Sequence, residues 1–198
     1  QIFDFNRIQT SDIVNYLEKI SKEEAIEYEK DAFNIIAQKA DGGMRDALSI
    51  YDQIISFSGN SVNYKNVIDN LNVLDYEYYF SMIDQFLKGD ISNVMLTFNE
   101  ILNQGFDARN FLSGLSSHFR NLLVSRDKIT LTLMDVGENI KQRYLTQTAE
   151  CGQDFLLNGL DLLNKADNQY NTSQNKRLHI EILLIQLCRL NEKKKNIQ

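Results

Sequence analysis

Apolar residues recur every three or four positions along most of the chain, with polar or charged residues between them. This period is typical of amphipathic helices that turn one face toward a core. The first group of expected helices carries four apolar stripes. These are Ile13, Leu17 and Ile20; Ala32, Phe33, Ile36, Ala37 and Ala40; Ala47, Leu48, Tyr51, Ile54 and Ile55; and Val67, Ile68 and Leu71. Thr10 or Ser11 is the expected N-cap of the first helix, because both side chains can accept a hydrogen bond there.

A second group of helical stripes begins near Asp75. They are Tyr79, Phe80, Ile83, Phe86 and Leu87; Val94, Met95, Phe98, Ile101 and Leu102; Phe111, Leu112, Leu115, Phe119, Leu122 and Leu123; Ile140, Tyr144 and Leu145; Phe155, Leu156, Leu160 and Leu163; and Leu178, Ile182, Ile185 and Leu187. Residues 128–136 are less regular and are predicted to form a loop or a short turn of helix. The sequence thus predicts an all-α fold with a small helical domain over residues 1–74 and a larger helical bundle over residues 75–198.

The composition supports long helices in an ordinary folded protein. Hydrophobic residues make up 43% of the chain, which can build a core, and the chain contains no proline, the residue that most often breaks helices. Cys151 and Cys188 have no disulfide or metal-ligand spacing, so we expect a reduced, cytoplasmic chain with both thiols in the core. No apolar run approaches the roughly 18 residues of a membrane span, and no membrane partner is expected.

The charge of the chain disfavours DNA binding by these residues alone. The formal net charge is −6, and the first 74 residues carry most of it, with 7 Lys and Arg against 12 Asp and Glu. Proteins that grip DNA by themselves usually carry a basic excess, because neutralisation of phosphates drives the binding. Arg120, Arg126 and Lys128 form a local basic cluster in the sequence, which we interpret as an exposed face or a subunit contact.

The sequence contains no recognisable catalytic motif. No glycine is followed by lysine, so the phosphate-binding P-loop of a nucleotide hydrolase is absent, and we expect no catalytic residue. No cluster of acids or histidines has metal-ligand spacing, and no metal site is expected. His118 and His179 are predicted to lie at a helix surface or a core edge. Four neighbouring aromatic residues could stack on bases, but no basic residues alternate with them, and packing is the favoured interpretation. They are Tyr76, Tyr78, Tyr79 and Phe80.

Two glycines that lead straight into a helix form a different kind of signal. Gly42 and Gly43 precede the third expected helix, and Arg45 stands in its first turn. A helix N-terminus attracts anions, and a guanidinium offers a planar fork of donors that suits phosphate oxygens. One interpretation is therefore an arginine that reaches a bound phosphate. The alternative is an ion pair with Asp41 or Asp46, which local physical chemistry favours when it is considered alone.

The residues around this turn extend the pattern. The string Asp41-Gly42-Gly43-Met44-Arg45-Asp46-Ala47-Leu48 is preceded by Gln1-Ile2-Phe3-Asp4-Phe5 and followed by Asp52-Gln53. This order and spacing resemble the lid domain of the gamma/tau clamp-loader ATPases of bacterial DNA polymerase III. Residues 75–190, with Phe98-Asn99-Glu100 and the segment 177–188, resemble the third domain of the same family, the collar.

The resemblance implies a role in nucleotide sensing. In the family, an AAA+ ATPase domain precedes the lid, and its Ser-Arg-Cys arginine-finger motif lies directly before the position that matches Gln1. The chain is therefore expected to lack the hydrolytic machinery and to be no enzyme by itself, although the full-length protein would be an ATPase component of the polymerase holoenzyme. Arg45 matches the sensor-2 arginine, with Gly42, Gly43 and Met44 supporting the helix start. ATP and Mg²⁺ would be bound by the missing ATPase domain.

The resemblance also implies partners. The collar is expected to assemble a pentamer with other clamp-loader subunits of the gamma/tau, delta and delta-prime types, and the assembly would act on a sliding clamp and primer-template DNA during DNA replication. The chain would then couple ATP binding to clamp loading. Two alternatives stay open from the sequence: an unrelated helical interaction scaffold in which Arg45 makes a structural ion pair, and a related clamp-loader subunit of the delta-prime or replication factor C type.

Overall fold

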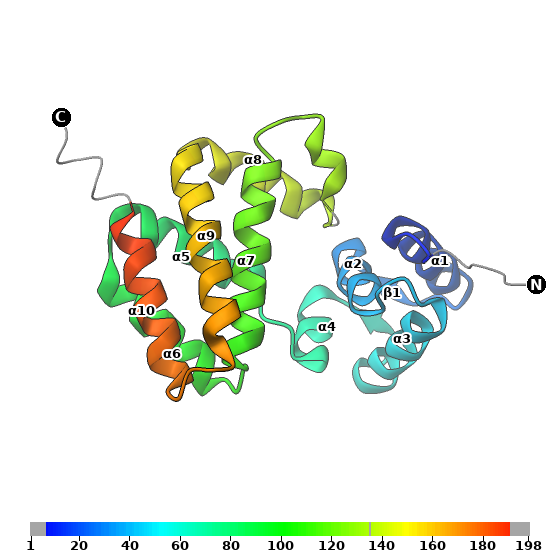
Figure 1. Cartoon of the computed structure of the whole chain (residues 1–198). Helices are drawn as coiled ribbons and strands as arrows, with labels where there is room; N and C mark the ends of the chain where they lie inside the picture. Colours follow the sequence, from blue (N-terminus) through cyan, green and yellow to red (C-terminus); the bar gives the residue numbers. More distant parts are fainter. Residues whose placement is uncertain (1–6, 135, 191–198) are drawn as a thin grey trace, which may run out of the picture. The chain divides into compact units, whose positions relative to one another are not determined.

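The chain is almost entirely helical, as the apolar periodicity predicted (Figure 1). The structure is a computed structural model that describes residues 7–134 and 136–190. Its helices are α1 (Thr10–Glu23), α2 (Lys30–Lys39), α3 (Met44–Ser58), α4 (Tyr64–Leu71), α5 (Tyr76–Lys88), α6 (Ile91–Asn103), α7 (Ala108–Val124), α8 (Glu138–Glu150), α9 (Gln153–Tyr170) and α10 (Lys176–Arg189), with a 3-10 turn η1 (Thr130–Leu133) and the strands β1 (Glu27–Tyr28) and β2 (Ser61–Val62). The all-α prediction is confirmed.

Contacts divide the chain into two compact units. The first unit contains Gln1–Val73 and Asp135–Gln142, and the second contains Leu74–Met134 and Arg143–Gln198. The sequence pattern gave no sign that residues 135–142 would group with the first unit. The assignment of lid and collar roles to residues 1–74 and 75–198 stays a prediction.

Helices α1 to α4 build the first unit around a small apolar core. Phe33, Ile36 and Tyr51 are almost completely buried, and the stripes predicted for α2 and α3 supply about half of the buried apolar residues of this unit. The helices are joined by a pair of parallel strands, β1 and β2, that sequence periodicity did not reveal, because each strand has only two residues. Helix α1 begins one residue after Gln9, which has no side-chain cap bond, so the predicted cap at Thr10 or Ser11 is wrong.

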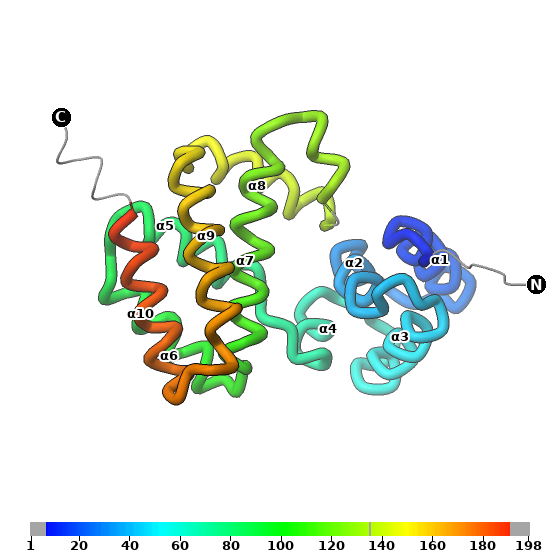
Figure 2. The backbone as a smooth tube through the Cα atoms, viewed as in Figure 1, coloured from blue at the N-terminus to red at the C-terminus, as the bar shows by residue number. Residues whose placement is uncertain are grey.

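The second unit is a bundle in which α7 and α9 run side by side and α9 also packs on α10 (Figure 2). Two of its helices begin at aspartates that cap them: Asp90 accepts a hydrogen bond from the backbone N–H of Asn93, and Asp107 accepts from those of Arg109 and Asn110. Gly89 ends α5 in the left-handed conformation that glycine adopts readily. The predicted loop or short turn at residues 128–136 contains the turn η1.

Helix α10 differs from its prediction in the face that it buries. Leu178 and Ile182 were expected in the core, but each is 48% exposed. Because α10 is apolar around most of its circumference, periodicity could not select the inward face. The residues that are buried instead are Ile180, Leu183, Leu184, Leu187 and Cys188.

Candidate functional site: the turn between α2 and α3

The segment between α2 and α3 is a tight turn built from two left-handed residues. Asp41 has φ +47° and Gly42 has φ +81°, and the Gly43 N–H donates to the carbonyl of Ala40 at 2.9 Å. For a residue with a Cβ atom, such as Asp41, the left-handed region costs roughly 1–2 kcal/mol. The sequence prediction that two glycines separate α2 from α3 is confirmed, since α2 ends at Lys39 and α3 begins at Met44.

Both glycines of the turn also allow close approach of other groups. A Cβ atom on Gly42 would lie 2.7 Å from Cβ of Arg7, and one on Gly43 would lie 2.7 Å from Oδ2 of Asp46. Such distances are shorter than real carbon contacts, so the backbone positions of residues 7 and 42 depend on glycine. The segment N-terminal to α1 therefore lies directly against the turn that precedes α3.

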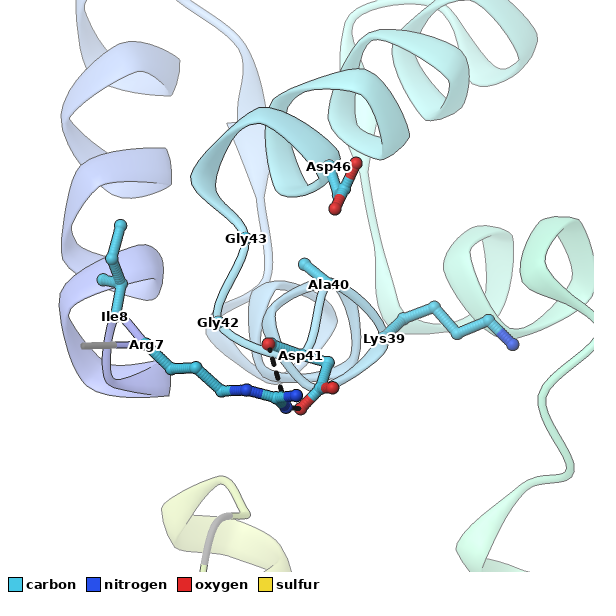
Figure 3. A pocket seen from close by; sticks show the side chains of 8 residues that line it. All are labelled: Arg7, Ile8, Lys39, Ala40, Asp41, Gly42, Gly43 and Asp46. Carbon is cyan, nitrogen blue, oxygen red and sulfur yellow. Dashed lines mark hydrogen bonds and ion pairs between the residues drawn. The ribbon is translucent and has the colours of Figure 1, made fainter. Parts of the chain in front are cut away.

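A surface hollow of about 650 Å³ lies over this turn (Figure 3). Its walls combine two cations with two carboxylates, and Lys39 extends away from the Arg7–Asp41 pair. The lining residues are Arg7, Ile8, Lys39, Ala40, Asp41, Gly42, Gly43 and Asp46. Gly42 and Gly43 thus contribute to the hollow, whereas Met44 and Arg45 do not line it.

Arg45 is the second residue of α3 and is exposed to solvent. Its carbonyl accepts a hydrogen bond from Ser49 Oγ at 2.9 Å, as in an ordinary helix. Among residues 7–134 and 136–190, the guanidinium of Arg45 forms no ion pair or hydrogen bond, and neither Asp41 nor Asp46 is paired with it. The ion-pair alternative raised by the sequence is therefore not observed in the described part of the chain.

Arg7 is the partner that Asp41 has instead. The Arg7 guanidinium forms an ion pair with the Asp41 carboxylate, and its Nη1 lies 3.5 Å from the Asp41 carbonyl oxygen (Figure 3). The neighbouring Ile8 N–H donates to the Gly42 carbonyl at 3.2 Å. The sequence prediction missed Arg7, because 34 residues separate it from Asp41 and no local pattern connects them.

One face of α3 packs in the core of the first unit. Ala47, Tyr51 and Ile54 are buried along one face, and the Tyr51 hydroxyl forms a 2.7 Å hydrogen bond with Ser21 Oγ. Burial raises the pKa of Tyr51 above its ordinary value, while the bond to Ser21 opposes that rise. Because one face of α3 is fixed in the core, its first turn presents Arg45 to solvent from a rigid support.

Of the three other basic candidates of the sequence, Lys128 is exposed, whereas Arg120 and Arg126 have structural roles. Arg120 donates to the Leu133 carbonyl at 3.0 Å, and Arg126 donates to the Cys151 carbonyl at 2.7 Å. Both guanidinium groups therefore satisfy backbone carbonyls within the second unit. Cys151 is buried, as the sequence predicted, and burial raises the pKa of its thiol to about 12.

His118 lies deep in the second unit, so its prediction at a helix surface or core edge is wrong. Its Nδ1 bonds to the Tyr144 hydroxyl at 2.8 Å, and its Nε2 lies 3.3 Å from Oε1 of Gln147. Burial lowers the pKa of His118 to about 3, which keeps the imidazole neutral. Tyr79 and Phe80 surround the ring, which confirms packing as the role of these two aromatics. His179 is part-buried and bonds to the carbonyl of Ala166 at 2.8 Å.

Residues 7–134 and 136–190 contain no group of three or more His, Cys, Asp or Glu side chains that could hold a metal ion. In the same residues, no helix combines the length and the apolar character that crossing a membrane requires.

Known proteins resemble both parts of the chain. Residues 12–60 match the family described as DNA polymerase III clamp loader subunit, ATPase lid domain, and residues 62–198 match DNA polymerase III subunits gamma and tau domain III. The DNA polymerase III subunit tau of Bacillus subtilis (strain 168) is 30% identical over 190 residues, which cover 95% of this chain and 33% of that protein. Protein STICHEL-like 2 of Arabidopsis thaliana is 25% identical over 188 residues, 94% of this chain and 21% of that protein.

A solved structure shares the fold. The DNA clamp loader delta protein of Bacillus subtilis matches with a TM-score of 0.55 at 15% identity, over 92% of this chain and 57% of that one. At this identity the likeness concerns the fold alone. The match to domain III covers more than half of the chain, and the unrelated scaffold that the sequence left open is not supported. The chain therefore belongs to the family of DNA polymerase III gamma and tau subunits, the clamp-loader family that its sequence motifs resembled.

Proposed function

We propose that the chain is the lid and collar part of a clamp-loader subunit that couples ATP binding to sliding-clamp loading in cytoplasmic DNA replication. Residues 1–74 act as the sensor-2 lid, and residues 75–198 act as the collar. The chain spans 33% of the Bacillus subtilis relative, so the activity of a whole subunit extends beyond what these residues contain. This sequence contains no P-loop lysine. In the proposal, an ATPase domain outside this sequence therefore hydrolyses ATP.

The position of Arg45 is the observation that carries this proposal. It stands exposed in the first turn of α3, and its guanidinium has no partner among the described residues. A cation at a helix N-terminus is mildly unfavourable without an anion close by. An exposed arginine that pairs with none of the described residues, on a helix fixed by Ala47 and Tyr51, is suited to a ligand from outside the unit.

The described residues fit one contact with a nucleotide rather than a whole nucleotide site. They offer no group of metal-ligating side chains, so Mg²⁺ and the bulk of ATP would be held elsewhere in the subunit. Arg45 fits a phosphate, because its planar donors match phosphate oxygens bidentately. Gly42, Gly43 and Met44 support this contact by setting where α3 begins.

In the proposed mechanism Arg45 donates hydrogen bonds to the phosphates of ATP bound by the ATPase domain of the same subunit. This contact stabilises a closed arrangement of lid and ATPase domain. Loss of the γ-phosphate removes a charge-assisted contact, and the population shifts toward an open arrangement. The collar stays assembled with gamma/tau, delta and delta-prime subunits while the lids move around the clamp and the primer-template DNA.

The test replaces Arg45 with alanine in the full-length subunit. A hydrogen bond between charged groups contributes about 1.5–3 kcal/mol, so ATP-dependent clamp loading is expected to fall roughly tenfold or more at subsaturating ATP. Assembly of the complex, measured by size-exclusion chromatography with light scattering, is expected to stay intact because Arg45 lies outside the second unit.

Lys65→Ala is the matched control for Arg45→Ala. Lys65 is the second residue of α4, as Arg45 is the second residue of α3, and it is likewise an exposed cation of the first unit. Clamp loading by the Lys65 variant is expected to equal that of the unmodified protein. Equal clamp loading by the Arg45 variant would refute the sensor role.

A further inference from the structure

The turn between α2 and α3 adopts a conformation that local sequence alone does not hold. Asp41 and Gly42 are consecutive left-handed residues, and only the second is a glycine. Backbone conformations of this kind persist where surrounding contacts determine them. The contacts that surround this turn therefore help the two glycines to fix where α3 begins and where Arg45 stands.

Residues 7 and 8 supply those contacts from the segment N-terminal to α1. Arg7 pairs with the Asp41 carboxylate and also approaches the Asp41 carbonyl, while the Ile8 N–H donates to the Gly42 carbonyl at 3.2 Å. Gly42 leaves space for residues 7 and 8, because a Cβ atom on residue 42 would lie 3.2 Å from the Ile8 carbonyl oxygen. Consecutive residues of one segment thus contact consecutive residues of the turn.

We propose that Arg7 and Asp41 form a positioning pair that fixes the turn before α3 and thereby sets the reach of Arg45 toward phosphate. Neither residue of the pair touches the nucleotide in this proposal. The inference rests on the proposed function and adds the part that aligns the sensor.

The exposure of the pair indicates an effect on position rather than on overall stability. The side chains of Arg7 and Asp41 are 73% and 74% exposed, and exposed ion pairs contribute little to the free energy of folding. A weak pair can still select one backbone arrangement of a short turn among several. Its loss should then change the apparent affinity for ATP and leave the melting temperature almost unchanged.

The experiment is a double-mutant cycle with Arg7→Ala and Asp41→Asn in the full-length subunit, assembled into the clamp loader. Asparagine tolerates the left-handed conformation as aspartate does, so Asp41→Asn removes the charge without new backbone strain. Each single variant is expected to raise the KM for ATP about two- to fivefold with little change in kcat. Because both variants break the same pair, the double variant is expected to match either single one.

Two further variants distinguish positioning of the turn by the Arg7–Asp41 pair from a general disturbance of the first unit. Arg7→Lys keeps the charge and should restore part of the change in KM. Lys30→Ala breaks another ion pair of the first unit, the 3.0 Å contact between Lys30 Nζ and Glu18 Oε1, in which the lysine side chain is 66% and the glutamate side chain 19% exposed, and should leave the KM unchanged. Additive effects in the double variant, or an equal effect of Lys30→Ala, would overturn the positioning pair.

The outcome for Arg45→Ala distinguishes the two proposals. If Arg45→Ala impairs clamp loading and the Arg7 and Asp41 variants do not, the sensor stands and the positioning pair is refuted. If Arg45→Ala has no effect, the sensor role is refuted. NMR spectra of the backbone amides of the 198-residue chain then test whether the Arg7–Asp41 pair positions the turn. Arg7→Ala and Asp41→Asn should shift the amide signals of Gly43 and Arg45 in the same direction, and unmoved signals would refute the pair.

Discussion

The two units differ in where their most distinctive polar side chains lie. In the first unit the polar groups of greatest interest are exposed: Arg45 has no partner among the described residues at the start of α3, and the Arg7–Asp41 pair lines the hollow. In the second unit a polar network is enclosed in the core, where His118 bonds to Tyr144 and Gln147. The first unit also encloses a polar pair, Ser21 and Tyr51, but the polar groups with a proposed function lie on its surface, whereas the network around His118 supports the core of the second unit.

This difference follows from what each arrangement costs. A buried polar atom without a partner costs about 1–3 kcal/mol, and no buried side-chain nitrogen or oxygen of the described residues lacks a hydrogen bond. Gln147, for example, donates to the Phe80 carbonyl at 2.8 Å and to Asp84 at 2.7 Å while it contacts His118. An exposed guanidinium bears no such cost, because water satisfies it. Substitutions should therefore disturb stability in the second unit and nucleotide response in the first.

The largest loss of stability is expected from Gly159→Ala in α9. A Cβ atom at this position would lie 2.3 Å from Cε1 of Phe119, whose ring is fully buried and packs near Phe155 at a centroid distance of 5.4 Å. Alanine favours a helix over glycine, but overpacking a tight core costs typically 1–3 kcal/mol. We expect denaturant unfolding to report a net loss of about 2 kcal/mol.

Asn158→Ala is the control, because Asn158 is exposed on the same helix and its replacement creates no clash. Its stability should stay within about 0.5 kcal/mol of the unmodified chain. A stable Gly159→Ala variant would mean that the α7–α9 contact is looser than the distances imply, and the contrast between the units would weaken.

A loss of stability that appears only in acid is expected from protonation of His118. The folded pKa of His118 is about 3, below its ordinary 6.5, so the unfolded chain binds a proton between these values and the folded chain does not. Stability from this group is complete above pH 6.5 and is lost as the pH falls toward 3. Its contribution to the slope is at most about 1.4 kcal/mol per pH unit.

The measurement compares urea unfolding from pH 7 to pH 4, a range chosen to span roughly the ordinary histidine pKa, in three proteins: the unmodified chain, His118→Asn and His179→Asn. His118→Asn is expected to lower the free energy of unfolding at neutral pH. It should also reduce the change of this free energy between pH 7 and roughly pH 4, because asparagine cannot take up the proton. His179 is only part-buried and serves as the matched histidine control. Identical slopes in the unmodified chain and the His118 variant would contradict a neutral, enclosed imidazole.

Sequence reasoning predicted the helices well because burial repeats along one face. The stripe of α2, for instance, was predicted from Ala32 to Ala40, and its members are all buried. The glycine turn was also predicted, since Gly42 and Gly43 are local signals for a helix end and a helix start. Features that depend on one short segment were therefore visible in the sequence.

Features that depend on distant residues were not visible. The Arg7–Asp41 pair joins residues 34 positions apart, and the bond between His118 and Tyr144 joins residues 26 positions apart. The sequence around a helical histidine does not show whether its ring is exposed or buried. Only the packing of α5, α7 and α8 around His118 determines its neutral state.

The smallest effect on stability is expected from Arg45→Ala in the 198-residue chain itself. Its guanidinium has no partner among the described residues, and a cation in the first turn of α3 opposes the helix dipole. Alanine removes that opposition and favours the helix, so denaturant unfolding should show no loss and up to about 0.5 kcal/mol of gain. A loss above about 1 kcal/mol would reveal a structural partner of Arg45 and weaken the sensor proposal. Combined with impaired clamp loading by the full-length variant, a neutral or stabilising result would mean that Arg45 is retained for a contact outside its own unit.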